Sequence, residues 1–266
     1  MNRALGAMLL AVATLAAQTN WCPFKKTEKP PSPPNCVVFV LFDLSGSTSN
    51  PELRGRYLDD FRKVLSSMGG GQLLMGDVIT ENTMATASYP INRSFPVYDP
   101  VVENEYTYKE KIRKDGSDVH EKARKLLQEI PAAPRTDLMN AFQLADKIFN
   151  GERGRSAGQK VLTVFSDMVE ESQYYDFTKE NLTKQRTEQI IEKQRKEGRL
   201  PNLKGVKVWI AGATAAPQGG LSAHRIYQIQ DFWLGYFAAC QADLTKERYA
   251  TTLINFELPC AVEKGK

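Results

Sequence analysis

The chain has 266 residues, of which 42% are hydrophobic and 25% are charged, and its formal net charge is +4. This length and apolar content suffice for one sizeable hydrophobic core, so a single domain of α/β size is the default expectation. The mild positive charge gives no argument for binding to nucleic acid.

The first 17 residues have the pattern of a secretory signal peptide. Arg3 supplies a positive charge, residues 4–17 are apolar, and small residues end the run, which favours cleavage after Ala16 or Ala17. The alternative is an uncleaved membrane anchor, although the apolar run is short for a span. We therefore predict an exported protein, periplasmic or extracellular, without a membrane span after cleavage.

Residues 18–35 are rich in lysine and proline and predict an extended linker ahead of a domain over residues 36–260. An even number of cysteines in an exported protein suggests two disulfides, and three pairings are possible. The alternative is four free or buried thiols. The cysteines are Cys22, Cys36, Cys240 and Cys260.

Apolar runs and helical periodicity alternate along the domain. Residues 37–42 are all apolar and predict a strand that is buried on both faces. A helix is predicted over residues 52–68, and the glycines at 69–71 end it. A second strand is predicted over 72–80, and a short third strand over 84–88.

Residues 90–118 contain several prolines and predict an irregular segment, followed by a helix to Ile130. Its tyrosines Tyr98, Tyr106 and Tyr108 suit a contact surface beside a binding site, because tyrosine is favoured in interfaces. Core packing and a mobile lid are equally compatible with the sequence.

The second half of the domain continues the alternation of helices and strands. The pattern predicts helices at 137–151, within 179–198 and at 222–242, and strands at 161–165, 206–211 and 249–256. Strand and helix repeated in this way predict a doubly wound, mostly parallel central sheet flanked by helices. In such sheets ligands bind at the carboxyl ends of the strands.

Hydroxyl and carboxylate side chains follow three of these segments. Asp43, Ser45 and Ser47 come directly after the first strand, Thr136 stands at the head of a helix, and Asp167 follows strand 161–165. All of them would reach the same edge of the sheet, although they are far apart in sequence. Oxygen donors of this kind suit a hard cation such as Mg²⁺, and Mn²⁺ accepts the same ligands.

The three segments resemble the von Willebrand factor type A domain of bacterial exported proteins. Asp43-x-Ser45-x-Ser47, then Thr136 in Arg-Thr-Asp-Leu, then Asp167 after an apolar strand match the family's metal-ion-dependent adhesion site in order and rough spacing. The first motif alone is common, whereas three segments at predicted strand or helix ends are specific. The resemblance implies a Rossmann-like α/β fold.

The resemblance covers about residues 36–257 and implies a role for each site residue. Ser45 and Ser47 would bind Mg²⁺ directly, Thr136 would bind it directly or through water, and the two aspartates would act through bound water and hydrogen bonds. Neutral hydroxyls leave the cation much of its charge, so a partner's Asp or Glu could complete its coordination. This implies a metal-dependent protein-binding module and not an enzyme.

Two positions depart from the family. Met168 follows Asp167 where the family often has glycine, and the usual final helix has no counterpart between the last predicted strand and Lys266. The resemblance therefore does not imply a conformational switch that acts through such a helix.

Two other functions are compatible with the residues. A Mg²⁺-dependent phosphoryl hydrolase would use Asp43 as nucleophile, although Ser45 stands where such enzymes commonly have a second acid. A structural module with a degenerate metal site is the third possibility, since each site residue alone could be a helix cap or turn residue. His120 and His224 lie outside the set, and surface or capping roles are expected for both.

Overall fold

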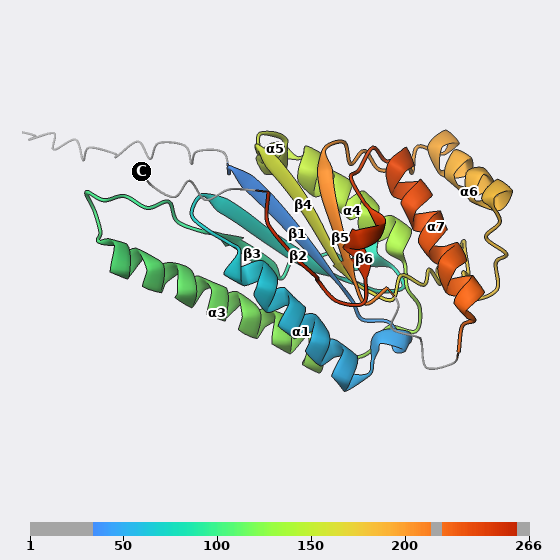
Figure 1. The fold of residues 1–266 in the computed structure, drawn as a ribbon, viewed down its shortest axis with the longest axis horizontal. Coiled ribbons are helices and arrows are strands. Elements are labelled where there is room, and N and C mark those ends of the chain that lie inside the picture. The colour runs from blue at the N-terminus through green and yellow to red at the C-terminus, as the bar shows by residue number, and fades with distance from the viewer. Residues whose placement is uncertain (1–33, 214–219, 260–266) are drawn as a thin grey trace, which may run out of the picture. The chain divides into compact units, whose positions relative to one another are not determined.

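The computed structural model describes residues 34–213 and 220–259, all within the second of two units into which the chain divides after Ser32. These residues form a six-stranded sheet in the order β3-β2-β1-β4-β5-β6, with helices on both faces (Figure 1). Only the β2–β3 pair is antiparallel. The strands are β1 (Cys36–Asp43), β2 (Gln72–Ile79), β3 (Ile91–Ser94), β4 (Gln159–Phe165), β5 (Val206–Ala211) and β6 (Tyr249–Ala250). The predicted doubly wound, mostly parallel sheet is confirmed.

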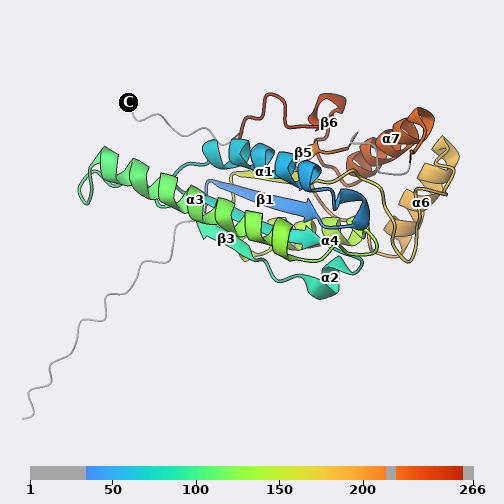
Figure 2. The ribbon, with the colours of Figure 1, turned by 90° about the horizontal axis from the view of Figure 1, so that it is seen from below.

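Helices cover both faces of this sheet, and in Figure 2, seen from below, α3 lies in front of the strands. Because successive strand residues point to opposite faces, β1 divides the core. Its even-numbered residues pack with α1 and α3, and its odd-numbered residues up to Leu41 pack with α4 and α7. The helices are α1 (Pro51–Ser66), α2 (Thr83–Thr86), α3 (Glu105–Glu129), α4 (Leu138–Asn150), α5 (Glu152–Arg155), α6 (Lys184–Lys196) and α7 (Ala223–Ala239), with 3₁₀ turns η1 (Gly46–Thr48) and η2 (Lys246–Arg248).

The strand predicted over residues 84–88 is wrong. Helix α2 covers part of it, and the edge strand β3 comes later in the chain. The buried carboxylate of Asp77 accepts hydrogen bonds from the backbone N–H groups of Ser88 (2.9 Å) and Tyr89 (2.8 Å). Tyr89 also has φ of +49°, so this segment turns around a side chain instead of pairing as a strand.

The irregular segment predicted over residues 90–118 is also largely wrong, because α3 begins at Glu105. Asn104 caps this helix by accepting a hydrogen bond from the Thr107 N–H (2.8 Å). The buried residues of α3 all lie in its second half, at Val119, Ala123 and Leu127. The first half therefore carries no apolar periodicity from which a helix could be recognised.

The tyrosines of this segment lie at the amino end of the parallel strands. The prediction that they form a contact surface beside the metal site is therefore wrong. The N–H of Gly71, just before β2, donates to the carbonyl of Phe95 (3.0 Å). Tyr98 and Tyr108 pack against each other with ring centroids 5.1 Å apart, and Tyr106 is exposed. Asp43 stands at the other edge of the sheet, where β1 ends.

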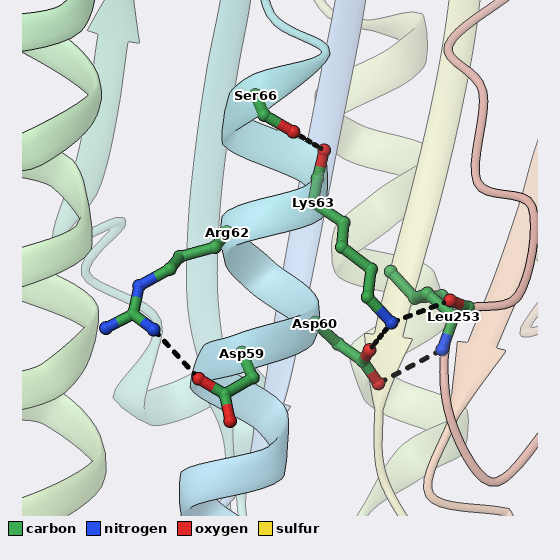
Figure 3. A network of polar contacts seen from close by, with 6 residues as sticks. All are labelled: Asp59, Asp60, Arg62, Lys63, Ser66 and Leu253. Atoms are coloured by element: carbon green, nitrogen blue, oxygen red, sulfur yellow. Dashed lines mark hydrogen bonds and ion pairs between the residues drawn. The ribbon is translucent and has the colours of Figure 1, made fainter.

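The strand predicted over residues 249–256 is confirmed only for its first two residues, which form β6. Beyond β6 the chain runs along α1, as Figure 3 shows. Asp60 accepts a hydrogen bond from the Leu253 N–H (3.0 Å), and Lys63 donates to the Leu253 carbonyl (2.9 Å) and to Asp60 (2.6 Å). Of the described residues after β6, which end at Pro259, none is helical.

Replacing Asp60 with alanine should lower the free energy of unfolding by about 2–3 kcal/mol, because it leaves the buried Leu253 N–H without its acceptor and Lys63 without its ion pair. Urea unfolding measures this change. The matched control is Asp59→Ala one position earlier, whose ion pair with Arg62 is exposed on both sides. Its expected effect is within about 0.5 kcal/mol. Equal losses in both variants would refute the anchoring role of Asp60.

The cysteines correct one expectation. Cys240 is a buried free thiol at the end of α7, and burial raises its pKa, so the prediction of two disulfides is wrong for this residue. The pairing of Cys36 with Cys22 or Cys260 stays a prediction, because both of those residues lie outside the described ranges. The signal peptide and nearly all of the linker lie outside them too. Over the described ranges no helix has the length and apolar character that a membrane span needs.

Candidate metal centre

The first and the last of the three predicted segments meet because β1 and β4 are parallel neighbours in the sheet. Phe42 pairs with Phe165, so the residues that follow the two strands emerge side by side. Asp43 ends β1, and Asp167 comes two residues after β4. Their shared position follows from the topology alone.

Backbone hydrogen bonds join the middle segment, which carries Thr136, to the other two. The N–H of Ala133 donates to the carbonyl of Leu44 (2.8 Å), just after β1. Thr136 and Glu171 exchange two backbone hydrogen bonds, of 3.3 and 2.9 Å, which join the head of α4 to the loop after β4. Thr136 is 2% exposed. All three predicted segments therefore adjoin one another at the carboxyl edge of the sheet.

Asp43 lies at the centre of this edge and is completely buried. One carboxylate oxygen accepts a hydrogen bond from the Ser45 N–H (2.8 Å), and the other accepts from the Ser166 hydroxyl (2.6 Å). Burial raises the pKa of Asp43, whereas the hydrogen bonds from these two serines and the charge of Arg54 lower it. Asp43 thus holds the start of the loop after β1 against the end of β4.

The turn η1 places the hydroxyls of Ser45 and Ser47 together. Their Oγ atoms are 3.0 Å apart, with Ser45 buried and Ser47 half-buried. Thr48 closes the turn, since its hydroxyl donates to the carbonyls of Asp43 (2.8 Å) and Ser45 (3.1 Å). Two neutral oxygen donors are therefore held side by side next to the buried acid.

Asp167 presents a carboxylate oxygen that is buried and has no hydrogen-bond partner among the described residues. Its other oxygen accepts from the Val169 N–H (3.0 Å). Burial, and then the negative charge of Asp43, raises the pKa of Asp167 to about 7, while nearby Ser47 lowers it. A buried, unpartnered and ionised carboxylate beside a second acid is unfavourable unless a proton or a cation neutralises it.

The donor set fits a divalent cation. The segments that adjoin at this edge carry two carboxylates, Asp43 and Asp167, and three hydroxyls, on Ser45, Ser47 and Thr136. Hard oxygen ligands are those that Mg²⁺ and Mn²⁺ prefer. A cation would compensate the charges of Asp43 and Asp167 and give the free oxygen of Asp167 a partner. Over the described ranges no three His, Cys, Asp or Glu side chains form a metal-holding group, so this donor set depends on its hydroxyls.

Met168 takes the backbone conformation in which glycine is commonest. Its φ is +64°, in the left-handed region. The Ser166 hydroxyl accepts a hydrogen bond from its N–H (2.9 Å), and the indole of Trp233 donates to its carbonyl (2.8 Å). These contacts hold the loop in a glycine-like path although the residue is a buried methionine.

Glu170 is a residue of this edge that the sequence did not reveal. It is completely buried, and one carboxylate oxygen accepts from the N–H groups of Leu138 (2.8 Å) and Met139 (3.3 Å) in the first turn of α4. Burial, and then the charge of Asp137, raises the pKa of Glu170 to about 8. Sequence patterns reveal an acid that accepts hydrogen bonds at a helix start only when it lies next to that helix in the chain, and Glu170 is 32 residues away from Leu138.

The arginine at position 54 was also missed. Arg54 is buried and donates to the carbonyls of Thr48 (3.1 Å) and Leu127 (2.6 Å), which links η1 to the end of α3.

Of the two histidines, His224 is exposed in the first turn of α7, and His120 is half-buried on α3.

No family model and no curated protein matches this sequence. Among solved structures, the chain is similar to manganese-loaded Plasmodium vivax TRAP protein, with a TM-score of 0.41, 13% identity, and coverage of 73% of this chain and 62% of that one. It is also similar to the pilus adhesin SpaC from Lactobacillus rhamnosus GG in an open conformation, with a TM-score of 0.43, 11% identity, and coverage of 82% and 27%. In both cases the match covers less than two thirds of the other chain. Scores this low carry no functional assignment.

Proposed function

We propose that this protein is a von Willebrand factor type A module that binds Mg²⁺, or Mn²⁺, and offers the cation to a carboxylate of a protein partner. The observation that carries the proposal is the buried, unpartnered carboxylate oxygen of Asp167 beside the paired hydroxyls of Ser45 and Ser47. The residues that would hold the metal are Asp43, Ser45, Ser47, Thr136 and Asp167.

The contacts of these residues support a separate role for each of them. Ser45 and Ser47 supply neutral donors, so a bound cation would keep enough charge to attract a further anion. Asp43 positions Ser45 through its backbone N–H and supports the charge balance from a buried place. When bound, the cation supplies a Lewis acid that can accept the side chain of an Asp or Glu from the partner.

The same contacts argue against a phosphoryl hydrolase. A nucleophilic aspartate needs a carboxylate oxygen that can approach phosphorus. Both oxygens of Asp43 are engaged, with the Ser45 N–H and the Ser166 hydroxyl, and the side chain is completely buried. Binding without catalysis is therefore the function that the geometry supports best.

The proposal also includes export of the protein. It assigns residues 1–17 to a signal peptide and residues 18–35 to a linker.

Calorimetric titration of Mg²⁺ into the full chain tests the metal site. We expect saturable binding in the wild type and loss of binding in Ser45→Ala/Ser47→Ala, since two of the direct ligands are removed. The matched control is Ser49→Ala, whose exposed hydroxyl donates to the Gly46 carbonyl (2.7 Å) in the same turn. Wild-type protein that binds no Mg²⁺ or Mn²⁺, or a double variant that binds normally, would overturn the proposal.

A second measurement separates a receptor for carboxylates from a purely structural metal site. In the Mn²⁺-loaded protein, acetate should displace a coordinated water and lower the relaxation enhancement of bulk water protons. Chloride at the same ionic strength is the control. Metal binding without a response to acetate would identify a structural module in place of an adhesion site.

A further inference from the structure

A groove between α1 and α3 lies apart from the candidate metal centre at the carboxyl edge of the sheet. Its volume is about 550 Å³, and it lies along the second half of α1. The turn η1, which carries Ser47 of the candidate metal centre, instead precedes the first residues of that helix. Figure 1 shows α1 and α3 together on one face of the sheet. The lining residues are Arg62, Leu65, Ser66, Met68, Lys109, Ile112, Arg113, Gly116, Ser117 and His120.

The charges that line the groove are all positive. Arg62 comes from α1, Lys109 and Arg113 come from α3, and the described lining contains no acidic residue. Figure 3 shows the Arg62 side chain extending from α1 toward α3, on the side away from Leu253. Charge complementarity therefore favours an anionic occupant.

Each of these cations already has an acidic neighbour on its own helix. The pairs are Arg62–Asp59 (2.9 Å), Lys109–Glu105 (2.5 Å) and Arg113–Glu110 (2.7 Å). All three pairs are solvent-exposed, and exposed ion pairs contribute little free energy. The guanidinium groups also have five N–H donors each, so they can bind a further anion without giving up these contacts.

The floor of the groove is apolar. Met68 is buried, and Leu65 and Ile112 are half-buried beneath the charged side chains. A ligand that contacts both the apolar residues and the positive side chains of the groove needs an acidic head on an apolar body.

Gly116 lines this groove without a side chain. It lies in the interior of the 25-residue helix α3, where glycine is less favourable than alanine by about 0.5–1 kcal/mol. A Cβ at this position would meet no described atom within 4 Å, so packing in the fold does not require glycine here. His120, one turn further along, has a buried Nε2 atom without a hydrogen-bond partner among the described residues.

We propose that this groove binds a small amphiphilic anion. Arg62 and Arg113 hold the acidic head, and the apolar body lies on Leu65, Met68 and Ile112. The site does not depend on the metal centre and belongs to the same folded unit.

Fluorescence titration of the full chain with 1-anilinonaphthalene-8-sulfonate tests this site, because that probe joins a sulfonate to an apolar ring system. We expect one saturable site whose dissociation constant rises about tenfold or more in Arg62→Gln/Arg113→Gln, since each variant residue loses a charge-assisted hydrogen bond. Gly116→Leu should abolish binding by filling the groove. The control is Arg56→Gln, an exposed arginine of α1 outside the lining.

Competition identifies the chemistry of the occupant. Decanoate should displace the probe, whereas inorganic phosphate or decanol alone should displace it far less. Circular dichroism checks that each variant is folded, and the exposed arginine pair keeps the test valid if Gly116→Leu fails to fold. Ser45→Ala/Ser47→Ala should leave probe binding unchanged, which separates this site from the metal centre.

Two results would overturn the proposal. The first is probe binding that is absent, or unchanged in the arginine and glycine variants. The second is loss of probe binding in Val101→Ser/Tyr106→Ser, because these exposed apolar residues lie outside the groove.

Discussion

Replacing Glu170 with glutamine should stabilise the folded protein much more at pH 8 than at pH 5. The pKa of Glu170 is raised to about 8 in the fold by burial and by the charge of Asp137. Between its unfolded pKa, near 4.5, and 8, the folded state holds a proton that the unfolded state has released. Wild-type stability therefore falls as the pH rises through this window. Glutamine is neutral throughout and can still accept from the Leu138 N–H.

Urea unfolding of both proteins at pH 5 and pH 8 measures the effect. The advantage of Glu170→Gln should grow by roughly 3 kcal/mol between the two values, since a tenfold change in proton affinity corresponds to about 1.4 kcal/mol. Glu188→Gln makes the same chemical change on the exposed face of α6 and should change stability by less than about 0.5 kcal/mol at either pH. An advantage that does not depend on pH would contradict the buried, protonated state of Glu170.

Asp43→Asn should abolish the stabilisation of the protein by Mg²⁺ while leaving the metal-free fold intact. The amide keeps an acceptor for the Ser45 N–H, and it removes the negative charge that lies against Asp167. The same change removes the charge that the proposed cation needs. At a metal concentration of one hundred times the dissociation constant, the wild type should gain about 2.7 kcal/mol, and the variant should gain nothing.

Unfolding with and without MgCl₂ measures this difference. The control is Asp59→Asn, an exposed acid of α1 that should keep the full response to Mg²⁺. A variant that loses its fold in the absence of metal, or that retains the Mg²⁺-dependent gain, would show that Asp43 does not have the assigned role.

The sequence sufficed for the parallel strands β1, β2, β4 and β5 and for the meeting of the site segments, but not for the two edge strands β3 and β6. The apolar runs in β1, β4 and β5 mark strands that are buried on both faces, and alternation with amphipathic helices leaves few topologies. Once these strands are parallel neighbours, Asp43 and Asp167 must emerge at one edge. Short-range pattern and topology therefore determine the architecture and most of the site's layout.

The features that escaped prediction depend on contacts between side chains and distant backbone groups. Glu170 acts on the first turn of α4, and Asp77 turns the segment before β3, but neither acid belongs to a recognisable motif. The first half of α3 is helical without burying an apolar face. Periodicity detects faces that are packed in a core, and it cannot detect bonds of this kind.

The attachment of Leu253 has a mechanical consequence. Asp60 accepts a hydrogen bond from its N–H, and Lys63 donates one to its carbonyl. Both bonds are to the main chain, so they do not depend on the side chain at position 253. A tension applied at Pro259 would load these two bonds on α1 before it reached β6. Helix α1, together with the packing of Phe256 on Trp209 of β5, would thus carry the pulling force into the body of the domain before it reached β6.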